Sequence, residues 1–241
     1  MSEVTICNLA LSHLGDTATV ASISPPDGSV QANLCARFYP VARNSMLEMS
    51  PWGFATRRAA LALVTNPTLT IAQAVDPNAE RGTWKYAYAL PNAVVNILGV
   101  LPADAPDDYE EWIGPADRTS GPPYPQGYLP VPGAPSYTPQ PYSIEIQADG
   151  TQILLTNVCD AALRYTTIIT DTSKFSPLFT LALSYLLASM LAGPILKGDA
   201  GIAAAEQQLG LFKAFKGQAE ASDANQRKTN VQPAVSWIRG R

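Results

Sequence analysis

PLFTLALSYLLASMLAG, residues 177–193, is the segment around which we expect the chain to fold. It contains no charged residue and predicts a helix that is apolar on nearly every face. Ser176 can cap the N-terminus of this helix, and Pro177 suits the first helical position because its missing N–H needs no partner there. Gly193 followed by Pro194 predicts where the helix ends.

Such an apolar helix is either a membrane span or the centre of a helical bundle. A span needs about 20 predominantly apolar residues, whereas this shorter stretch also carries hydroxyl groups. They belong to Thr180, Ser184, Tyr185 and Ser189. We therefore expect a bundle whose other helices cover this one, rather than the lipid-facing helix of a membrane-inserting protein.

The length and composition allow one large domain or two small ones, because domains contain roughly 100 to 200 residues and this chain has 241. Charged residues make up 15% of the chain, below the roughly 25% that is typical of soluble domains. Proline accounts for 21 residues. These values fit an assembly subunit whose surface is partly covered by partners, and they also fit a loop-rich monomer.

The net charge of −4 is unevenly distributed. After Asp223 the chain has basic residues and no acidic residue, so the rest of the chain is the more acidic part. The basic residues are Arg227, Lys228, Arg239 and Arg241. An acidic body argues against gripping nucleic acid by counterion release, which needs a basic surface. It is compatible with the wall of a channel through which DNA slides.

The cysteines and the N-terminus favour a reducing compartment. Cys7, Cys35 and Cys159 are widely spaced and form no CxxC motif, so neither a disulfide framework nor a zinc site is predicted. The N-terminal sequence has no basic region before its apolar residues and is not typical of a secretory signal. We expect the cytoplasm, and we expect no metal and no cofactor.

Three further helices are predicted, at 2–14, 30–49 and 199–225, because apolar residues recur there every three to four positions. Pro40 lies inside the second and is expected to kink it. The apolar stripe predicted for the third consists of Ile202, Ala205, Leu209, Phe212, Phe215 and Ala219. The glycines that we expect to permit close helix packing there are Gly201, Gly210 and Gly217.

The middle of the chain predicts strands. They are expected at 57–64, 84–90, 93–101, 142–148, 151–157 and 163–169. Asp149-Gly150 between two of them predicts a hairpin with a two-residue turn. Trp84, Tyr86 and Tyr88 alternate along one strand, which favours core or cross-strand packing over an aromatic platform for a ligand.

Residues 102–141 are different in kind, because they contain 11 of the 21 prolines. From residue 119 to residue 144 there is no charge, whereas disordered segments are usually charged. We interpret the segment as an extended arm that docks on a partner through apolar groups. The candidate docking residues are Tyr124, Tyr128, Leu129 and Tyr137. The alternative is a flexible surface insertion.

The residue types offer little for nucleophilic catalysis. A Ser or Cys nucleophile normally needs a base, most often His. His13 is the one histidine of the chain. Its position near the end of the first predicted helix is typical of a C-terminal cation rather than of a catalytic base. No GxSxG, GxxxxGK[ST] or helix-opening GxGxxG motif occurs.

One acidic cluster could supply the paired carboxylates of a glycan hydrolase or a site for a hard metal ion. It consists of Asp104, Asp107, Asp108, Glu110 and Glu111, followed by Trp112. A tail-associated glycan hydrolase that uses Asp107, Glu110 or Glu111 is thus the alternative function. An exposed acidic loop is the more common origin of such a cluster, so we do not predict an enzyme.

Five segments together resemble the tail tubular protein A family, the head-to-tail adaptors of short-tailed bacteriophages. They are ICNLALSHLGD (6–16), AxxCARFYPVAR (32–43), PWGFATRRAAL (51–61), WKYAYALP (84–91) and TDTSKFSPLFTLALSYLLA (170–188). The succession of these packing motifs, over nearly the whole chain, carries the resemblance. The Pro-rich arm is longer than the connector that is usual in the family.

The resemblance implies a ring of copies, expected to be a dodecamer, between the portal protein and a nozzle like tail tubular protein B, with tail fibres as further neighbours. DNA would pass through the ring. The C-terminal segment would reach the portal through Val235, Trp237, Ile238, Arg239 and Arg241. The β-rich part and the Tyr-rich arm would face the nozzle or the fibres. The location implied is the virion, and the host cytoplasm during assembly.

The sequence as a whole predicts an α+β fold, an antiparallel bundle of about four helices with an inserted β-rich domain and a Pro-rich arm. The predicted bundle is discontinuous and consists of residues 1–55 and 171–226. The β-rich insertion is 56–170 and includes the arm, 102–141. Residues 227–241 are predicted to be a docking tail.

Overall fold

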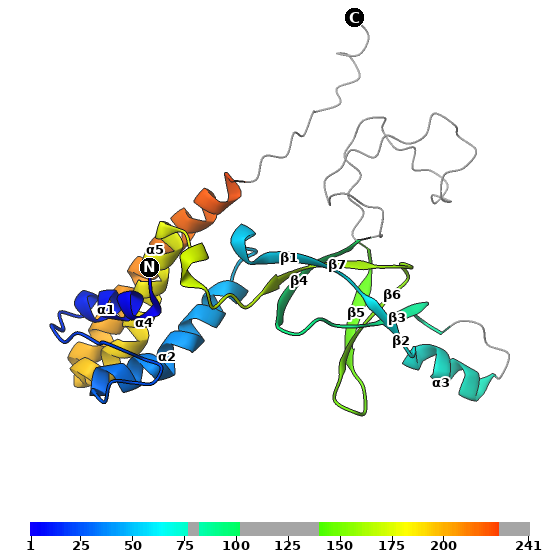
Figure 1. Ribbon diagram of the computed structural model, residues 1–241, viewed down its shortest axis with the longest axis horizontal. Helices are drawn as coiled ribbons and strands as arrows, with labels where there is room; N and C mark the ends of the chain where they lie inside the picture. Colours follow the sequence, from blue (N-terminus) through cyan, green and yellow to red (C-terminus); the bar gives the residue numbers. More distant parts are fainter. Residues whose placement is uncertain (77–81, 102–139, 227–241) are drawn as a thin grey trace, which may run out of the picture. The chain divides into compact units, whose positions relative to one another are not determined.

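The computed structural model describes residues 1–76, 82–101 and 140–226 (Figure 1). The chain mixes helices and sheets, which confirms the predicted α+β class. It divides into two compact units. The first contains residues 1–57, 93–96 and 165–226, and the second contains the described residues of 58–92, 97–101 and 140–164.

The first two predicted helices are confirmed almost to the residue, because each begins at a serine cap. Helix α1, Glu3–His13, begins after Ser2, whose hydroxyl accepts a hydrogen bond from the Thr5 N–H. Helix α2, Val30–Glu48, begins after Ser29, which caps the helix in the same way. Pro40 lies inside α2.

The apolar helix α4, Pro177–Leu196, begins as predicted, with the Ser176 hydroxyl accepting from the Phe179 N–H. Its predicted end at Gly193-Pro194 is wrong. Pro194 removes only its own N–H, and the Gly193 carbonyl still accepts from the Lys197 N–H at 3.0 Å. The helix ends where Lys197 adopts a positive φ of 57°.

Helix α4 is covered by other helices of the same unit (Figure 1). It packs against α1, α2 and α5, Gly198–Ala224, and these helices share one hydrophobic core. The α4 residues in that core are Phe179, Ala182, Leu183, Leu186, Leu187, Ala188 and Leu191. Among the described residues, α4 is the one helix that is long and apolar enough to cross a membrane. Its burial by neighbouring helices favours the alternative role, that of a core helix.

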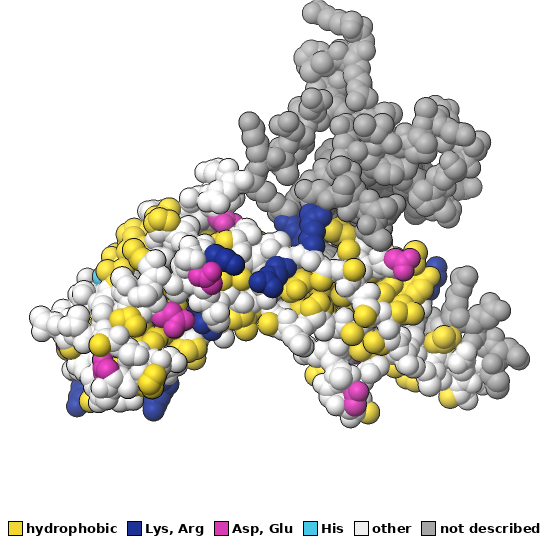
Figure 2. Space-filling view, in the orientation of Figure 1, with side chains coloured by type: hydrophobic (Ala, Val, Ile, Leu, Met, Phe, Trp, Pro, Cys, Tyr) yellow, Lys and Arg dark blue, Asp and Glu magenta, His cyan; other side chains and the backbone are white. Residues whose placement is uncertain are grey.

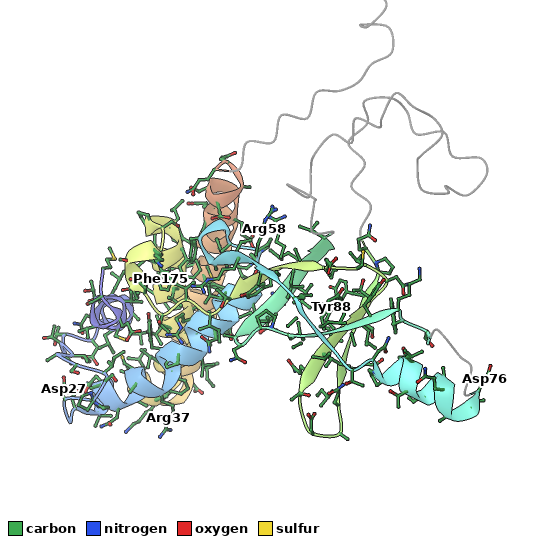
Figure 3. The ribbon with its side chains drawn as sticks, turned by 45° about the vertical axis from the view of Figure 1, so that its right-hand side comes forward. Asp27, Arg37, Arg58, Asp76, Tyr88 and Phe175 are labelled. Carbon is green, nitrogen blue, oxygen red and sulfur yellow. The ribbon has the colours of Figure 1, made fainter. Side chains whose placement is uncertain are left out.

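An aromatic cluster closes the N-terminal end of α4, beside Phe175 (Figure 3). The rings of Phe175 and Phe179 lie with centroids 4.8 Å apart, and Trp52 meets Phe179 edge-on at 4.9 Å. The Trp52 indole N–H donates to the Met46 carbonyl at 2.8 Å, so this buried ring has its polar group satisfied. Phe54 packs against the same rings.

Helix α5 buries part of the predicted stripe, since Phe212 and Ala219 are buried and Phe215 packs against the same core. Its buried residues are Gly201, Gln208, Phe212 and Ala219, whereas Ile202 and Leu209 of the predicted stripe are exposed. The glycine prediction holds for Gly201 alone. A Cβ on Gly201 would lie 3.1 Å from the Ala192 carbonyl oxygen, but Gly210 and Gly217 have no neighbour that a Cβ would meet.

The strands form two sheets. One has the order β1-β7-β4 and the other has the order β2-β3-β6-β5. Their bounds are Thr56–Ala60 (β1), Ala62–Val64 (β2), Tyr86–Ala89 (β3), Val94–Leu101 (β4), Tyr142–Ile146 (β5), Gln152–Thr156 (β6) and Ala162–Thr167 (β7). The single strand predicted for 57–64 is therefore two. Between them the Leu61 N–H pairs with the Ala161 carbonyl, and the chain passes from one sheet to the other.

The predicted β5–β6 hairpin is confirmed, but its loop has three residues rather than two. Gly150 donates to the Gln147 carbonyl and has a φ of 84°, while the Gln147 N–H pairs with the Thr151 carbonyl. A turn followed by a glycine in the left-handed region is the usual three-residue hairpin loop.

Helix α3, Pro67–Val75, was missed by the sequence analysis. Asn66 caps it by accepting from the Thr68 N–H at 3.0 Å, and Pro67 occupies its first position. This Asn-Pro pair was the available signal. None of the nine residues of α3 is buried, so their apolar spacing describes a surface helix rather than a core helix.

Replacing Leu187 by alanine tests the central position of α4. Leu187 is fully buried, so Leu187→Ala should lower the free energy of unfolding by about 2–5 kcal/mol through lost burial and the cavity it leaves. Urea unfolding followed by circular dichroism measures this. Leu211→Ala on α5, where the side chain is 37% exposed, is the matched control and should cost less than about 1 kcal/mol. Equal losses in the two variants would contradict the assignment.

Candidate interaction surfaces

The predicted docking and catalytic residues lie outside the described residues. These are Tyr124, Tyr128, Leu129 and Tyr137 of the arm, Val235, Trp237, Ile238, Arg239 and Arg241 of the tail, and the acidic cluster with Asp107, Glu110 and Glu111. Candidate sites on the described residues come from surfaces that the sequence analysis did not single out.

The first surface is a stripe on α5 formed by Ile202, Glu206, Leu209 and Lys213, here called the α5 stripe. These residues recur at intervals of three and four, so they share one side of the helix. Ile202 is 61% exposed and Leu209 is 38% exposed. At 100° per residue the stripe lies about 100° around the helix from the buried residues. It combines apolar anchors with one acidic and one basic side chain.

Hydrophobic side chains also lie on the exposed surface elsewhere (Figure 2). On the face shown, few charged side chains separate them, which agrees with the low charge content of the chain. Contiguous apolar surface of this kind marks interaction sites more often than isolated exposed residues do.

The second surface is a groove in the second unit, between α3 and the β5–β6 hairpin, here called the α3–hairpin groove. Its volume is about 580 Å³. It is lined by Thr65, Pro67, Thr70, Ile71, Glu145, Ile146, Gln147, Ala148, Asp149 and Ile153. The described lining residues therefore supply apolar groups and two carboxylates, and none of them is a lysine or an arginine.

Local contacts hold α3 in place beside the groove. The Asn66 side-chain amide donates to the Trp84 carbonyl at 2.7 Å. Gly82 lies against the first turn of α3, where a Cβ would come within 2.3 Å of the Thr68 carbonyl carbon. Only glycine fits such an approach, so the groove wall depends on this residue.

Strand β5 forms the other wall and is an edge strand, since β6 is its one partner among the described strands. Tyr142, Ile144 and Ile146 alternate along one of its faces and are 39%, 48% and 68% exposed. An exposed edge strand with apolar side chains is a template for pairing with another chain segment.

Tyr88 of β3 packs in the core rather than on the surface. Tyr88 is buried (Figure 3), and its hydroxyl donates to the Val158 carbonyl at 2.9 Å. Burial raises the pKa of this phenol above its ordinary value. Tyr88 is therefore a core residue with a satisfied polar group, as the sequence analysis favoured.

His13 joins three helices of the first unit. Its ring stacks on Tyr185 of α4 with centroids 4.0 Å apart, and Tyr185 stacks on Phe215 of α5 at 5.1 Å. The Gln208 side-chain amide donates to the His13 carbonyl at 3.1 Å, which satisfies one of the free carbonyls at the end of α1. His13 lies in the last turn of α1, as predicted. Burial lowers the pKa of His13 below its ordinary value, so desolvation disfavours the charged form expected there.

The contact between His13 and Ser184 is structural, although its length resembles that of a nucleophile–base pair. The two side chains are 3.0 Å apart, but the Ser184 hydroxyl donates to the Leu181 carbonyl at 2.7 Å. Its oxygen therefore accepts from the His13 Nε2–H. Ser184 is fully buried, and substrate cannot reach it.

The buried cysteines and the acidic groups are no better placed for chemistry. Cys7 and Cys35 are free and buried, and a hydrogen bond between them together with burial raises the pKa of Cys7, which disfavours a reactive thiolate. No cluster of three or more His, Cys, Asp or Glu side chains among residues 1–76, 82–101 and 140–226 is placed to hold a metal ion.

Comparison of the chain with models of known protein families and with curated proteins found no match.

The pH dependence of stability tests the environment of His13. Because the pKa of His13 is lowered on folding, the unfolded chain takes up a proton at a higher pH than the folded chain does. The contribution of neutral His13 to the free energy of unfolding is complete above pH 6.5. It is lost as the pH falls through that value towards the pKa of the folded chain. The free energy of unfolding should thus fall between about pH 8 and about pH 5.5 more steeply in the wild type than in His13→Gln.

Urea unfolding at several pH values measures the slope of the free energy of unfolding against pH for the wild type and for His13→Gln. The variant keeps every carboxylate, so a difference between the two slopes is due to His13. If the wild type instead gains stability relative to His13→Gln as the pH falls, folding favours charged His13, which would contradict the lowered pKa.

Proposed function

We propose that this chain is a structural adaptor subunit of a bacteriophage virion, the head-to-tail connector. Its copies form a ring, expected to be dodecameric, between the portal and the tail nozzle, and the ring lines the channel through which DNA leaves the head. The helices α1, α2, α4 and α5 are the antiparallel bundle of this adaptor, and the β-rich residues 56–170 are a domain inserted into it. It acts without catalysis, in the virion and, during assembly, in the host cytoplasm.

The observation that carries this proposal is the α5 stripe. Helix α5 has 27 residues, of which four are buried, so much of its surface is free for a neighbouring copy. Ile202 and Leu209 are the apolar anchors, and Glu206 and Lys213 between and beside them can pair with opposite charges. A ring needs such a surface on each subunit, where it contacts a different patch of the neighbouring copy. Repeating this contact closes a ring when the rotation from one copy to the next adds up to a full turn.

The sequence supplies the second support. The succession of motifs that resembles the tail tubular protein A family runs through α1, α2, β3 and α4. By that resemblance the portal partner is met by the tail residues Val235, Trp237, Ile238, Arg239 and Arg241, and the nozzle and fibres are met by the β-rich part. No described residue favours the glycan hydrolase, whose candidate carboxylates lie outside the described ranges.

Two glutamates on the α5 stripe test the ring. Ile202→Glu combined with Leu209→Glu should leave the subunit folded, because both side chains are exposed. It should lower the yield of rings on purified portal by at least about tenfold, because two apolar anchors of the contact become charged. Negative-stain electron microscopy of the portal mixed with each variant counts the rings.

Leu211→Glu is the matched control. Leu211 is 37% exposed, against 38% for Leu209, and lies about 200° around α5 from it. The control should form rings as the wild type does. Rings from the double variant at wild-type yield would overturn the role of the stripe, and a wild-type chain that never binds portal would overturn the proposed function.

A further inference from the structure

The α3–hairpin groove has the size and the chemistry of a site for an apolar, basic peptide. Ile153 at its floor is buried, whereas Ile71 and Ile146 on opposite walls are 67% and 68% exposed. A volume of about 580 Å³ exceeds the space that one indole ring occupies, so an aromatic anchor fits with room for its neighbours. The open edge of β5 beside it offers unpaired backbone groups to an extended segment.

The charges that line the groove favour an occupant with positive charge. Glu145 and Asp149 contribute carboxylates, and no basic side chain lies among the lining residues that the structure describes. Hydrogen bonds from the Thr151 hydroxyl and backbone N–H lower the pKa of Asp149, which keeps it ionised. A segment with positive charge and apolar side chains is complementary to this lining, and an acidic one is repelled.

The chain itself contains a segment of this composition. Residues 227–241, RKTNVQPAVSWIRGR, have four basic residues and no acidic one. Val235 and Trp237 are spaced by two, as in a segment that lays alternate side chains into a groove, and Arg239 and Arg241 continue the same alternation. The segment follows α5 directly and extends to at most about 50 Å.

We propose that the α3–hairpin groove is the docking site of the chain's own residues 227–241, with Trp237 among Ile71, Ile146 and Ile153 and the arginines against Glu145 and Asp149. A tail attached to its own groove has an effective concentration in the millimolar range when its length allows the contact, which exceeds the concentration of other copies in dilute solution. The tail of the same chain is therefore the occupant.

This contact makes the tail unavailable until a portal competes for it. The competition with the portal rests on the proposed function, but the contact between tail and groove does not. In the free subunit the groove holds Trp237 away from water and from non-specific partners. On the portal the same residues change partner, and the groove becomes open.

A labelled peptide of residues 227–241 tests the contact by fluorescence anisotropy. It should bind a chain that ends at Gln226 and bind the full chain at least about tenfold more weakly, because the attached tail occupies the groove. Ile71→Ser with Ile146→Ser in the truncated chain should weaken peptide binding by about tenfold or more. Glu145→Gln with Asp149→Asn should weaken it several-fold and reduce its dependence on salt.

Asp160→Asn is the control for the loss of a carboxylate, since Asp160 belongs to the same unit and does not line the groove. It should bind the peptide as the truncated chain does. Equal binding by the full and truncated chains, or binding that the groove variants leave unchanged, would overturn the proposal. So would a full-length chain whose association, seen by sedimentation, disappears on truncation, because the occupant would then be the tail of a second copy.

These results can be told apart from a failure of the proposed function. Peptide binding is measured without portal, so it can succeed for a chain that forms no rings. Conversely, if the chain forms rings on portal but its groove does not bind the peptide, the docking of the tail is contradicted and the proposed adaptor function is not.

Discussion

The burial of α4 is the constraint on which the rest of the first unit depends. A helix with apolar side chains on nearly every face must be covered, because each exposed leucine or phenylalanine forfeits about 1.5–3 kcal/mol of burial. Helices α1, α2 and α5 supply the cover, and the cluster of Trp52, Phe54, Phe175 and Phe179 closes one end. Helix α5 packs closely on the end of α4, because a Cβ on Gly201 would lie 3.1 Å from the Ala192 carbonyl oxygen.

The helices that cover α4 also have apolar side chains that do not pack in the core and remain exposed. Helix α5 contributes its side with Gly201, Gln208 and Phe212 to the core, and this leaves Ile202 and Leu209 exposed. In the second unit, α3 has no buried residue and β5 is an edge strand. Among the described residues, packing contacts instead engage His13 with Ser184 and Cys7 with Cys35. The molecule thus offers surfaces for association, and its titratable core groups serve packing.

Much of the fold could be predicted because its signals are local. Ser176 caps α4 as predicted, and Ser2 and Ser29 cap α1 and α2 in the same way. The end of α4 could not be predicted from Gly193-Pro194, because tertiary packing of α5 on that turn outweighs the local preference of the two residues. Only part of the predicted α5 stripe is buried, for a related reason. Its apolar residues lie on more than one side, and only the position of α4 decides which side is buried.

The candidate sites were harder to predict than the fold. A groove between α3 and a hairpin depends on Gly82 approaching Thr68 and on Asn66 binding Trp84, contacts between residues that are 14 to 18 positions apart. An exposed edge strand likewise depends on strand order, which periodicity does not encode. His13 illustrates the electrostatic side of the problem. Position alone predicts a cation, but the ring stacks on Tyr185 and its burial lowers the pKa, which disfavours the charge.

The most direct test of the account is a cryo-electron microscopy reconstruction of the chain bound to its portal. The account predicts a closed ring in which each α4 is covered by helices of its own subunit and each α5 stripe lies in the contact with the neighbouring copy. A ring whose α5 stripes face solvent, or one in which α4 is covered by helices of a neighbouring subunit, would contradict it.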